Sequence, residues 1–246
     1  MSSRLANWFG IELYRELPAT RRLGAGRYFF VALGVSYLLV AAGGFAPEVL
    51  GSVDLAHPLI AYVHGTLMMA WLLLFIVQAG FAASGVLKWH RTLGFAAIGL
   101  ATVMWISLGI ASVGQLNRFN TYDILLVQLI VMMLFGLFFV CGVLVRRDPS
   151  SHKRFLTLAT LVLLQAAVDR MNWLPSFGLT DYWPYAIRLY VLLIPLFVFD
   201  VVSIKRIHPV TLMGTAAILV AHTAISLFAT TSGWLNFAHA VTKPFR

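Results

Sequence analysis

Long apolar stretches occupy most of the chain, and short polar gaps separate them. A helix that crosses a membrane needs roughly 20 mainly apolar residues. Proline residues fall at or near the ends of the stretches, and Pro195 inside the sixth stretch predicts a kink. The pattern predicts an all-α integral membrane bundle of about seven transmembrane helices. They cover residues 27–46, 58–84, 92–114, 121–145, 153–175, 183–203 and 209–233.

The bundle shows no internal repeat and no domain boundary, and it covers residues 27–235. Residues 1–26 carry several charges before any apolar core begins. This arrangement predicts a cytoplasmic tail or an amphipathic helix at the membrane interface, rather than a cleavable signal peptide. Residues 236–246 are predicted to form a short outer tail.

Composition supports a lipid bilayer as the surroundings of the chain. Hydrophobic residues make up 60% of the 246 residues and charged residues only 11%, whereas a soluble domain carries about 25% charged residues. The net charge of +9 does not indicate a nucleic-acid partner, because most of the 18 basic residues lie in gaps between apolar runs. In such gaps basic residues orient the chain, and their bias predicts a cytoplasmic N-terminus and an outer C-terminus. Aromatic residues near the outer ends, Tyr182 and Trp183 among them, fit an interfacial belt.

One face of the second predicted helix carries groups that are costly inside a membrane. His57, His64, Trp71 and Gln78 recur every seven residues, a spacing that drifts only about 20° per heptad. Ionisable groups at membrane depth usually face a bundle interior or a water-filled cavity. We therefore expect a site near His64, with His57 at its rim and Trp71 and Gln78 in packing or hydrogen bonding.

Polar residues of other predicted helices reach a similar depth in the outer half of the bundle, on a rise of about 1.5 Å per residue. The predicted outer-half set consists of His64, Gln128, Asp169, Arg170, Arg188 and His222. Two interpretations remain open. The set forms a working site, or it is a structural network in which Asp169 pairs with Arg170 or Arg188 and the histidines bond to neighbouring helices.

A second polar layer lies at the predicted cytoplasmic face. It comprises Trp89, His90 and Arg91, then Ser151, His152, Lys153 and Arg154, and finally Asp200, Lys205, Arg206 and His208. Basic junctions of this kind ordinarily fix topology and contact anionic lipid headgroups. The alternative is a cytoplasmic site for an anion, a quinone or a partner protein.

Haem b binding with electron transfer is the leading functional expectation. A low-spin haem b needs two imidazoles on different helices at similar depth, and His64 and His222 are the pair within the apolar zone. Arg170 or Arg188 would pair with the haem propionates. The partner would be a quinone or another redox protein, and a second haem would have to use His90, His152 or His208.

Three other functions stay open. A zinc-dependent membrane hydrolase would need three protein ligands and a water, for which His64, His222 and Asp169 are the candidates. Seven-helix hydrolases of the adiponectin-receptor and alkaline-ceramidase type carry an HxxxH pair on the last helix. In this chain the residue four positions after His222 is Ser226, so the second histidine of that pair is missing. The His/Asp/Arg set also suits a proton or solute transporter. The last alternative is an accessory subunit of a larger membrane complex, with no cofactor and no chemistry of its own.

Three motifs together resemble a known family. They are His64-Gly65, then His90-Arg91-Thr92-Leu93-Gly94, then His152-Lys153-Arg154. The chain resembles, over about residues 57–175, a widespread bacterial family of multi-pass membrane proteins with an HG…HRxLG…HKR pattern. The resemblance implies a bacterial inner (plasma) membrane and assigns no activity. Helix count and histidine placement are also similar, by analogy only, to cytochrome b561-type haem bundles.

Overall fold

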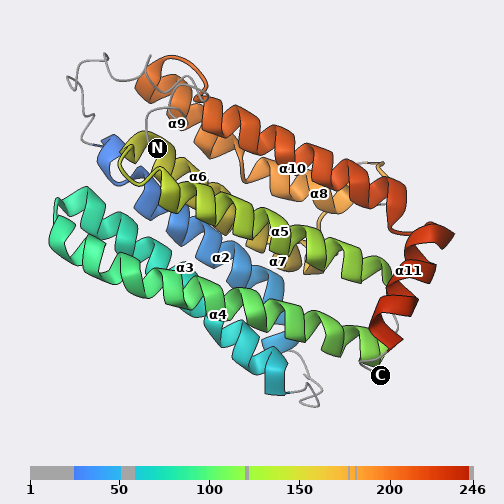
Figure 1. Cartoon of the computed structure of the whole chain (residues 1–246). Coiled ribbons are helices and arrows are strands. Elements are labelled where there is room, and N and C mark those ends of the chain that lie inside the picture. The colour runs from blue at the N-terminus through green and yellow to red at the C-terminus, as the bar shows by residue number, and fades with distance from the viewer. Residues whose placement is uncertain (1–24, 51–58, 120–121, 177, 181, 244–246) are drawn as a thin grey trace.

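The computed structural model describes residues 25–50, 59–119, 122–176, 178–180 and 182–243, and every regular element in these ranges is helical (Figure 1). After a short 3-10 helix, η2 (Ala25–Arg27), come α2 (Phe29–Leu50), α3 (Leu59–Ser84), α4 (Leu87–Phe119), α5 (Tyr122–Leu144), α6 (Pro149–Leu163), α7 (Gln165–Arg170), α8 (Trp183–Val191), α9 (Ile194–Ile204), α10 (Pro209–Phe228) and α11 (Ser232–Thr242). The predicted tail or interfacial helix at residues 1–26 lies almost entirely outside the described residues.

Six spans in the described residues are long and apolar enough to cross a membrane. They are α2, α3, α4, α5, α10 and the joined pair α8–α9. The chain therefore has the build of a multi-pass membrane protein. The predicted helix at 153–175 is the exception, because it is divided into α6 and α7 and ends at Arg170.

Two of the predicted helices are broken, for different local reasons. Pro195 lies in the first turn of α9, directly after the break, which confirms the predicted kink because proline suits the start of a helix and not its interior. The break between α6 and α7 falls at Leu164, whose N–H bonds to Leu161 O at 2.9 Å in a tightened turn. No proline or glycine marks that position. In contrast, α2 continues through Pro47 to Leu50, beyond the predicted end at residue 46.

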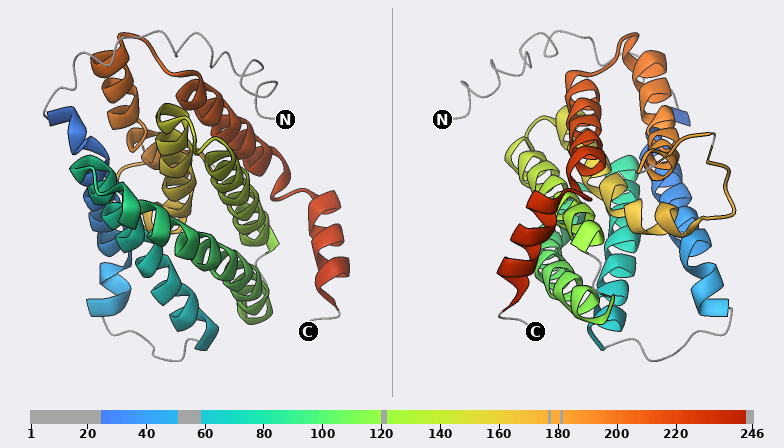
Figure 2. Two further views of the ribbon diagram at one scale, coloured as in Figure 1. Left: turned by 60° about the vertical axis from the view of Figure 1, so that its left-hand side comes forward. Right: turned by 90° about the vertical axis from the view of Figure 1, so that its right-hand side faces the viewer.

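Helix α6 lies at the centre of the bundle. It packs on α5 and α10, while α3 and α4 form a hairpin and α2 packs on α3 and α7. Figures 1 and 2 show α5 and α6 between the α3–α4 hairpin and α10. We call the end where α4, α6 and α10 begin the inner end, which is the predicted cytoplasmic face, and the opposite end the outer end.

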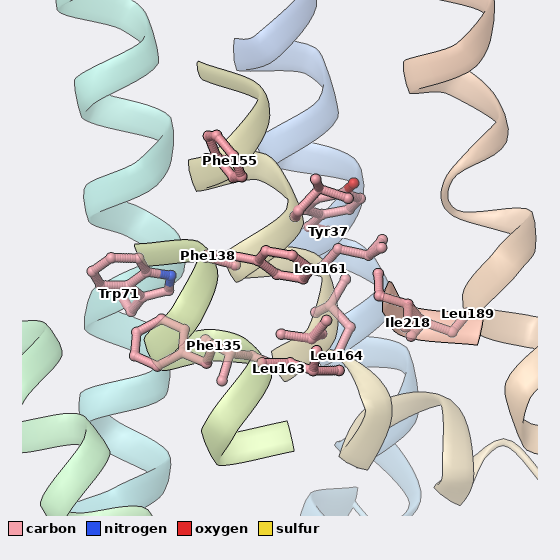
Figure 3. Close-up of a cluster of buried hydrophobic side chains, with 14 of the residues drawn as sticks. Tyr37, Trp71, Phe135, Phe138, Phe155, Leu161, Leu163, Leu164, Leu189 and Ile218 are labelled. Carbon is pink, nitrogen blue, oxygen red and sulfur yellow. The ribbon is translucent and has the colours of Figure 1, made fainter. Parts of the chain in front are cut away.

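The core forms around α6, where large apolar side chains from several helices meet (Figure 3). Leu158 and Leu161 are fully buried. Trp71 of α3 packs edge-on against Phe135 of α5, with ring centroids 5.4 Å apart. Its indole N–H also donates to Thr160 Oγ1 at 3.2 Å, so Trp71 both packs and hydrogen-bonds, as expected.

The C-terminal part of the described chain is a packed helix. Thr231 caps α11, which lies across the outer end in Figure 1. The Trp234 indole donates to Tyr122 O at 2.8 Å and ties α11 to α5. Most of the predicted outer tail at 236–246 is therefore helical and held against the bundle.

Candidate functional site

The first predicted site residue, His64, lies on α3 and faces α4. Its Nδ1 is 2.9 Å from Ser107 Oγ. The Ser107 hydroxyl donates its own proton to Met104 O at 2.7 Å, so His64 Nδ1–H is the donor in the contact. The imidazole thus makes a bond to a neighbouring helix of the kind that the structural interpretation expects.

His222 lies on α10 among tyrosines, away from His64. Its Nδ1 is 2.9 Å from Tyr190 Oη, and the Tyr182 ring centroid is 5.4 Å from that of the imidazole. Helix α3 packs on α2 and α4, whereas α10 packs on α5, α6 and α8. The two predicted haem ligands therefore have separate surroundings and do not line one shared pocket.

The predicted zinc ligands are likewise not assembled. Among the residues that the structure describes, no three His, Cys, Asp or Glu side chains form a group that could hold a metal ion. Asp169 instead accepts a hydrogen bond from Gln165 Nε2 at 2.5 Å. His57 lies outside the described residues.

Other members of the predicted outer-half set also have local roles. Arg170 donates to Ala166 O at 2.7 Å and lies over the Phe45 ring at 4.5 Å from its centroid. It thus covers the α2–α7 contact. Gln128 is half-buried on α5.

Asp169, Arg188 and His222 are grouped with Gln165, Tyr182 and Tyr190, none of which was a predicted site residue. We call this group the outer cluster: Gln165 and Asp169 of α7, Tyr182 before α8, Arg188 and Tyr190 of α8, and His222 of α10. Burial raises the pKa of the Tyr182 phenol, and the nearby Asp169 carboxylate and Tyr190 raise it further. Tyr182 therefore contacts His222 through its ring and lies within electrostatic range of the Asp169 carboxyl.

Arg188 holds a buried positive charge at the edge of the outer cluster. The residue is 8% exposed, and its guanidinium donates to Val168 O at 3.2 Å and Leu174 O at 3.0 Å. These carbonyls, rather than a direct ion pair with Asp169, fix its position. Because both carbonyls belong to the segment after α6, Arg188 also ties α8 to α7 and to the loop that follows it.

Three buried polar atoms of the outer cluster have no hydrogen-bond partner within the described part of the chain. They are Gln165 Oε1, Tyr182 Oη and Arg188 Nε. A buried donor or acceptor left without a partner costs about 1–3 kcal/mol, and such atoms in native proteins usually contact an ordered water or a ligand. The outer cluster therefore offers three unsatisfied polar atoms to a water or a small polar ligand.

A different arrangement occupies the inner end. Arg154 and Asp200 are 1% and 0% exposed and form an ion pair, in which Arg154 Nε donates to Asp200 Oδ1 at 2.8 Å and Nη2 donates to the same oxygen. Asp200 Oδ2 accepts from His208 N at 2.9 Å and from Thr211 Oγ1 at 2.6 Å. We call these four residues the inner network. Arg154 is thus a buried link between α6, α9 and α10, not a surface charge that contacts lipid headgroups.

Tyr182 and Tyr190 are the functional candidates that sequence reasoning missed. Tyr182 was expected in an interfacial belt, but its hydroxyl is buried. Aromatic residues near a helix end fit a belt and a buried site equally well, so the sequence holds no signal that separates the two.

No protein-family model matches the chain, and neither the curated proteins nor the solved structures include a significantly similar protein.

Proposed function

We propose that the chain is a multi-pass protein of a bacterial plasma membrane in which the outer cluster binds and releases a proton during transport across that membrane. One observation carries the proposal: the Tyr182 ring contacts His222, which in turn bonds to Tyr190, and the Asp169 carboxyl is near enough to Tyr182 to act on it electrostatically. Ionisable groups at membrane depth are costly and mark proton relays and substrate paths. A row of four proton-exchanging groups is difficult to explain as packing alone.

The chemistry of the row suits proton transfer. The Tyr190 phenol and His222 Nδ1 are 2.9 Å apart, so either group can donate to the other. The ring centroids of Tyr182 and His222 are 5.4 Å apart, and Tyr182 Oη has no partner among the described residues, which suits a water or a polar solute as the bridge. The Arg188 charge acts on the Asp169 carboxylate and favours its ionised form once a proton has left.

The test compares two carboxyl variants of the purified protein. Asp169→Asn removes the carboxyl of the outer cluster, whereas Asp123→Asn removes an exposed carboxyl at the start of α5. Infrared difference spectra between low and high pH should contain a buried carboxyl band that Asp169→Asn abolishes and Asp123→Asn retains. In proteoliposomes with a trapped pH dye, an imposed membrane potential should drive proton movement that only Asp169→Asn abolishes.

Two results would contradict the proposal. The first is an infrared spectrum in which Asp169→Asn and the unmodified protein titrate alike, and the second is proton movement that survives in Asp169→Asn. The absorption spectrum of the same purified protein tests the alternative that the chain binds haem b. A Soret band that shifts on reduction, and that is lost in both His64→Ala and His222→Ala, would replace the transport proposal.

A further inference from the structure

Two motif histidines lie close together at the inner end of the bundle. His90 lies in the first turns of α4 and His152 in the first turn of α6. Their ring centroids are 6.3 Å apart and the rings are nearly perpendicular, at 87°. Both residues are half-buried, and they belong to the basic junctions predicted to lie at the cytoplasmic face. The fold thus joins the HRxLG and HKR motifs at one accessible position.

Hydrogen bonds fix the same tautomer on both rings. His90 Nδ1 is 3.2 Å from Gln78 O, and His152 Nδ1 is 2.7 Å from Gly142 O. A backbone carbonyl only accepts, so each Nδ1 must carry the proton. In the neutral rings Nε2 is then left with its lone pair. Histidines that bind metals are oriented in this way, with the second ring nitrogen donating to a carbonyl or a carboxylate.

Basic side chains next to His152 are directed to other partners. Lys153 Nζ lies 5.0 Å from the ring centroids of both Phe30 and Phe199, and Arg154 is committed to Asp200. Arg146 Nη1 donates to Val143 O at 3.1 Å. These cations are therefore held by rings, a carboxylate and a carbonyl instead of forming an anion cradle around the two imidazoles.

We infer that His90 and His152 bind one divalent first-row transition-metal ion through their Nε2 atoms, with water as the remaining ligands. A metal–nitrogen distance of about 2.0 Å and a ring radius of about 1.2 Å allow centroids up to about 6.4 Å apart when two imidazoles bind one ion from opposite sides. The observed 6.3 Å is close to that limit. Opposed nitrogen ligands with open water positions suit the tetragonal geometry of Cu2+, which also binds nitrogen sites most tightly among these ions.

Copper titration of the full chain tests this site. The protein is purified in detergent without a histidine tag, stripped with chelator and titrated with Cu2+. We expect one tight Cu2+ per chain, with electron paramagnetic resonance splitting from two nitrogens. His90→Gln and His152→Gln should each weaken binding about tenfold or more, whereas His239→Gln, at an exposed position on α11, should leave it unchanged. Equal affinity in all three variants overturns the inference.

A measurement on the unmodified protein guards against misfolding of the glutamine variants. The electron paramagnetic resonance spectrum of the Cu2+-loaded full chain counts its nitrogen ligands without any substitution, and we expect two equivalent nitrogens. The glutamine variants are compared only when they keep the helical circular dichroism of the unmodified protein. A spectrum with no nitrogen ligand, or with only one, would show that His90 and His152 do not share an ion.

Discussion

The inner network and the outer cluster contain similar polar groups, but they differ in whether those groups have hydrogen-bond or ion-pair partners. Both place an arginine and an aspartate in the bundle, with a histidine nearby. In the inner network Arg154 binds Asp200 directly, and the second Asp200 oxygen receives two further hydrogen bonds. In the outer cluster Arg188 binds carbonyls, and three buried polar atoms have no partner among the described residues.

The difference separates a structural role from a functional one. A buried ion pair with every lone pair used has nothing left to offer a ligand, and removing one partner leaves an uncompensated charge. A buried group without a partner carries a desolvation cost that a water, a proton or a solute can relieve. We therefore propose that the inner network stabilises the fold and that the outer cluster binds a ligand or a proton.

The largest expected effect is loss of stability on breaking the inner network. Asp200→Asn leaves the Arg154 guanidinium without its buried counter-ion, and we expect a loss of about 3–5 kcal/mol in the free energy of unfolding. Asp169→Asn, in the outer cluster, should cost much less because its carboxyl has no ion-pair partner among the residues that the structure describes. Denaturation in mixed detergent micelles measures both. The double variant Arg154→Met/Asp200→Leu should recover much of the loss, and equal losses in the two asparagine variants would erase the distinction between the regions.

The next largest expected effect is that the free energy of unfolding depends on pH through His208 of the inner network. Burial and the Arg154 charge lower the pKa of His208 to about 4, from its ordinary value of 6.5. Its Nδ1 also accepts the Val210 N–H at the start of α10, which requires the unprotonated ring. Between these two pKa values the unfolded chain binds more protons than the folded one, so stability is full above pH 6.5 and falls as the pH drops towards 4.

The loss amounts to about 3 kcal/mol at most, from 1.36 kcal/mol for each pKa unit. His208→Asn supplies a matched control, because asparagine also accepts a hydrogen bond at a helix N-cap and does not titrate. Unfolding followed from pH 7 to pH 4 should give a shallower decline for that variant. The same slope for both proteins would rule out His208 as the source of the pH dependence.

Much of the fold could be predicted because span length and hydropathy are local properties of the sequence. Proline at position 195 identified one break for the same reason. The break at Leu164 could not be found, since nothing in its own neighbourhood disfavours a continuous helix. The continuous apolar stretch therefore predicted one helix at 153–175, where the structure has two.

The site was less accessible to sequence reasoning. Counting residues along a helix gives the depth of Asp169, Arg188 and His222, but it does not give the rotation of each helix about its axis. That rotation directs His64 towards Ser107 and away from His222. Contacts such as that between His90 and His152 depend on which helices become neighbours, and this information is spread over the whole chain.

The smallest expected effect gives the finest comparison between the two regions, because it removes one hydroxyl from each. Thr211→Val deletes the hydroxyl that donates a hydrogen bond to Asp200 Oδ2 at 2.6 Å. Because a buried charged acceptor then loses a partner, we expect a loss of about 1–3 kcal/mol in the free energy of unfolding. Tyr182→Phe deletes a hydroxyl that has no partner among the described residues. Its removal should lower the free energy of unfolding by no more than about 0.5 kcal/mol while slowing proton movement in proteoliposomes. If Tyr182→Phe destabilised the protein as much as Thr211→Val, the Tyr182 hydroxyl would be a structural hydrogen-bonding group. The outer cluster would then not be a binding site of the kind proposed.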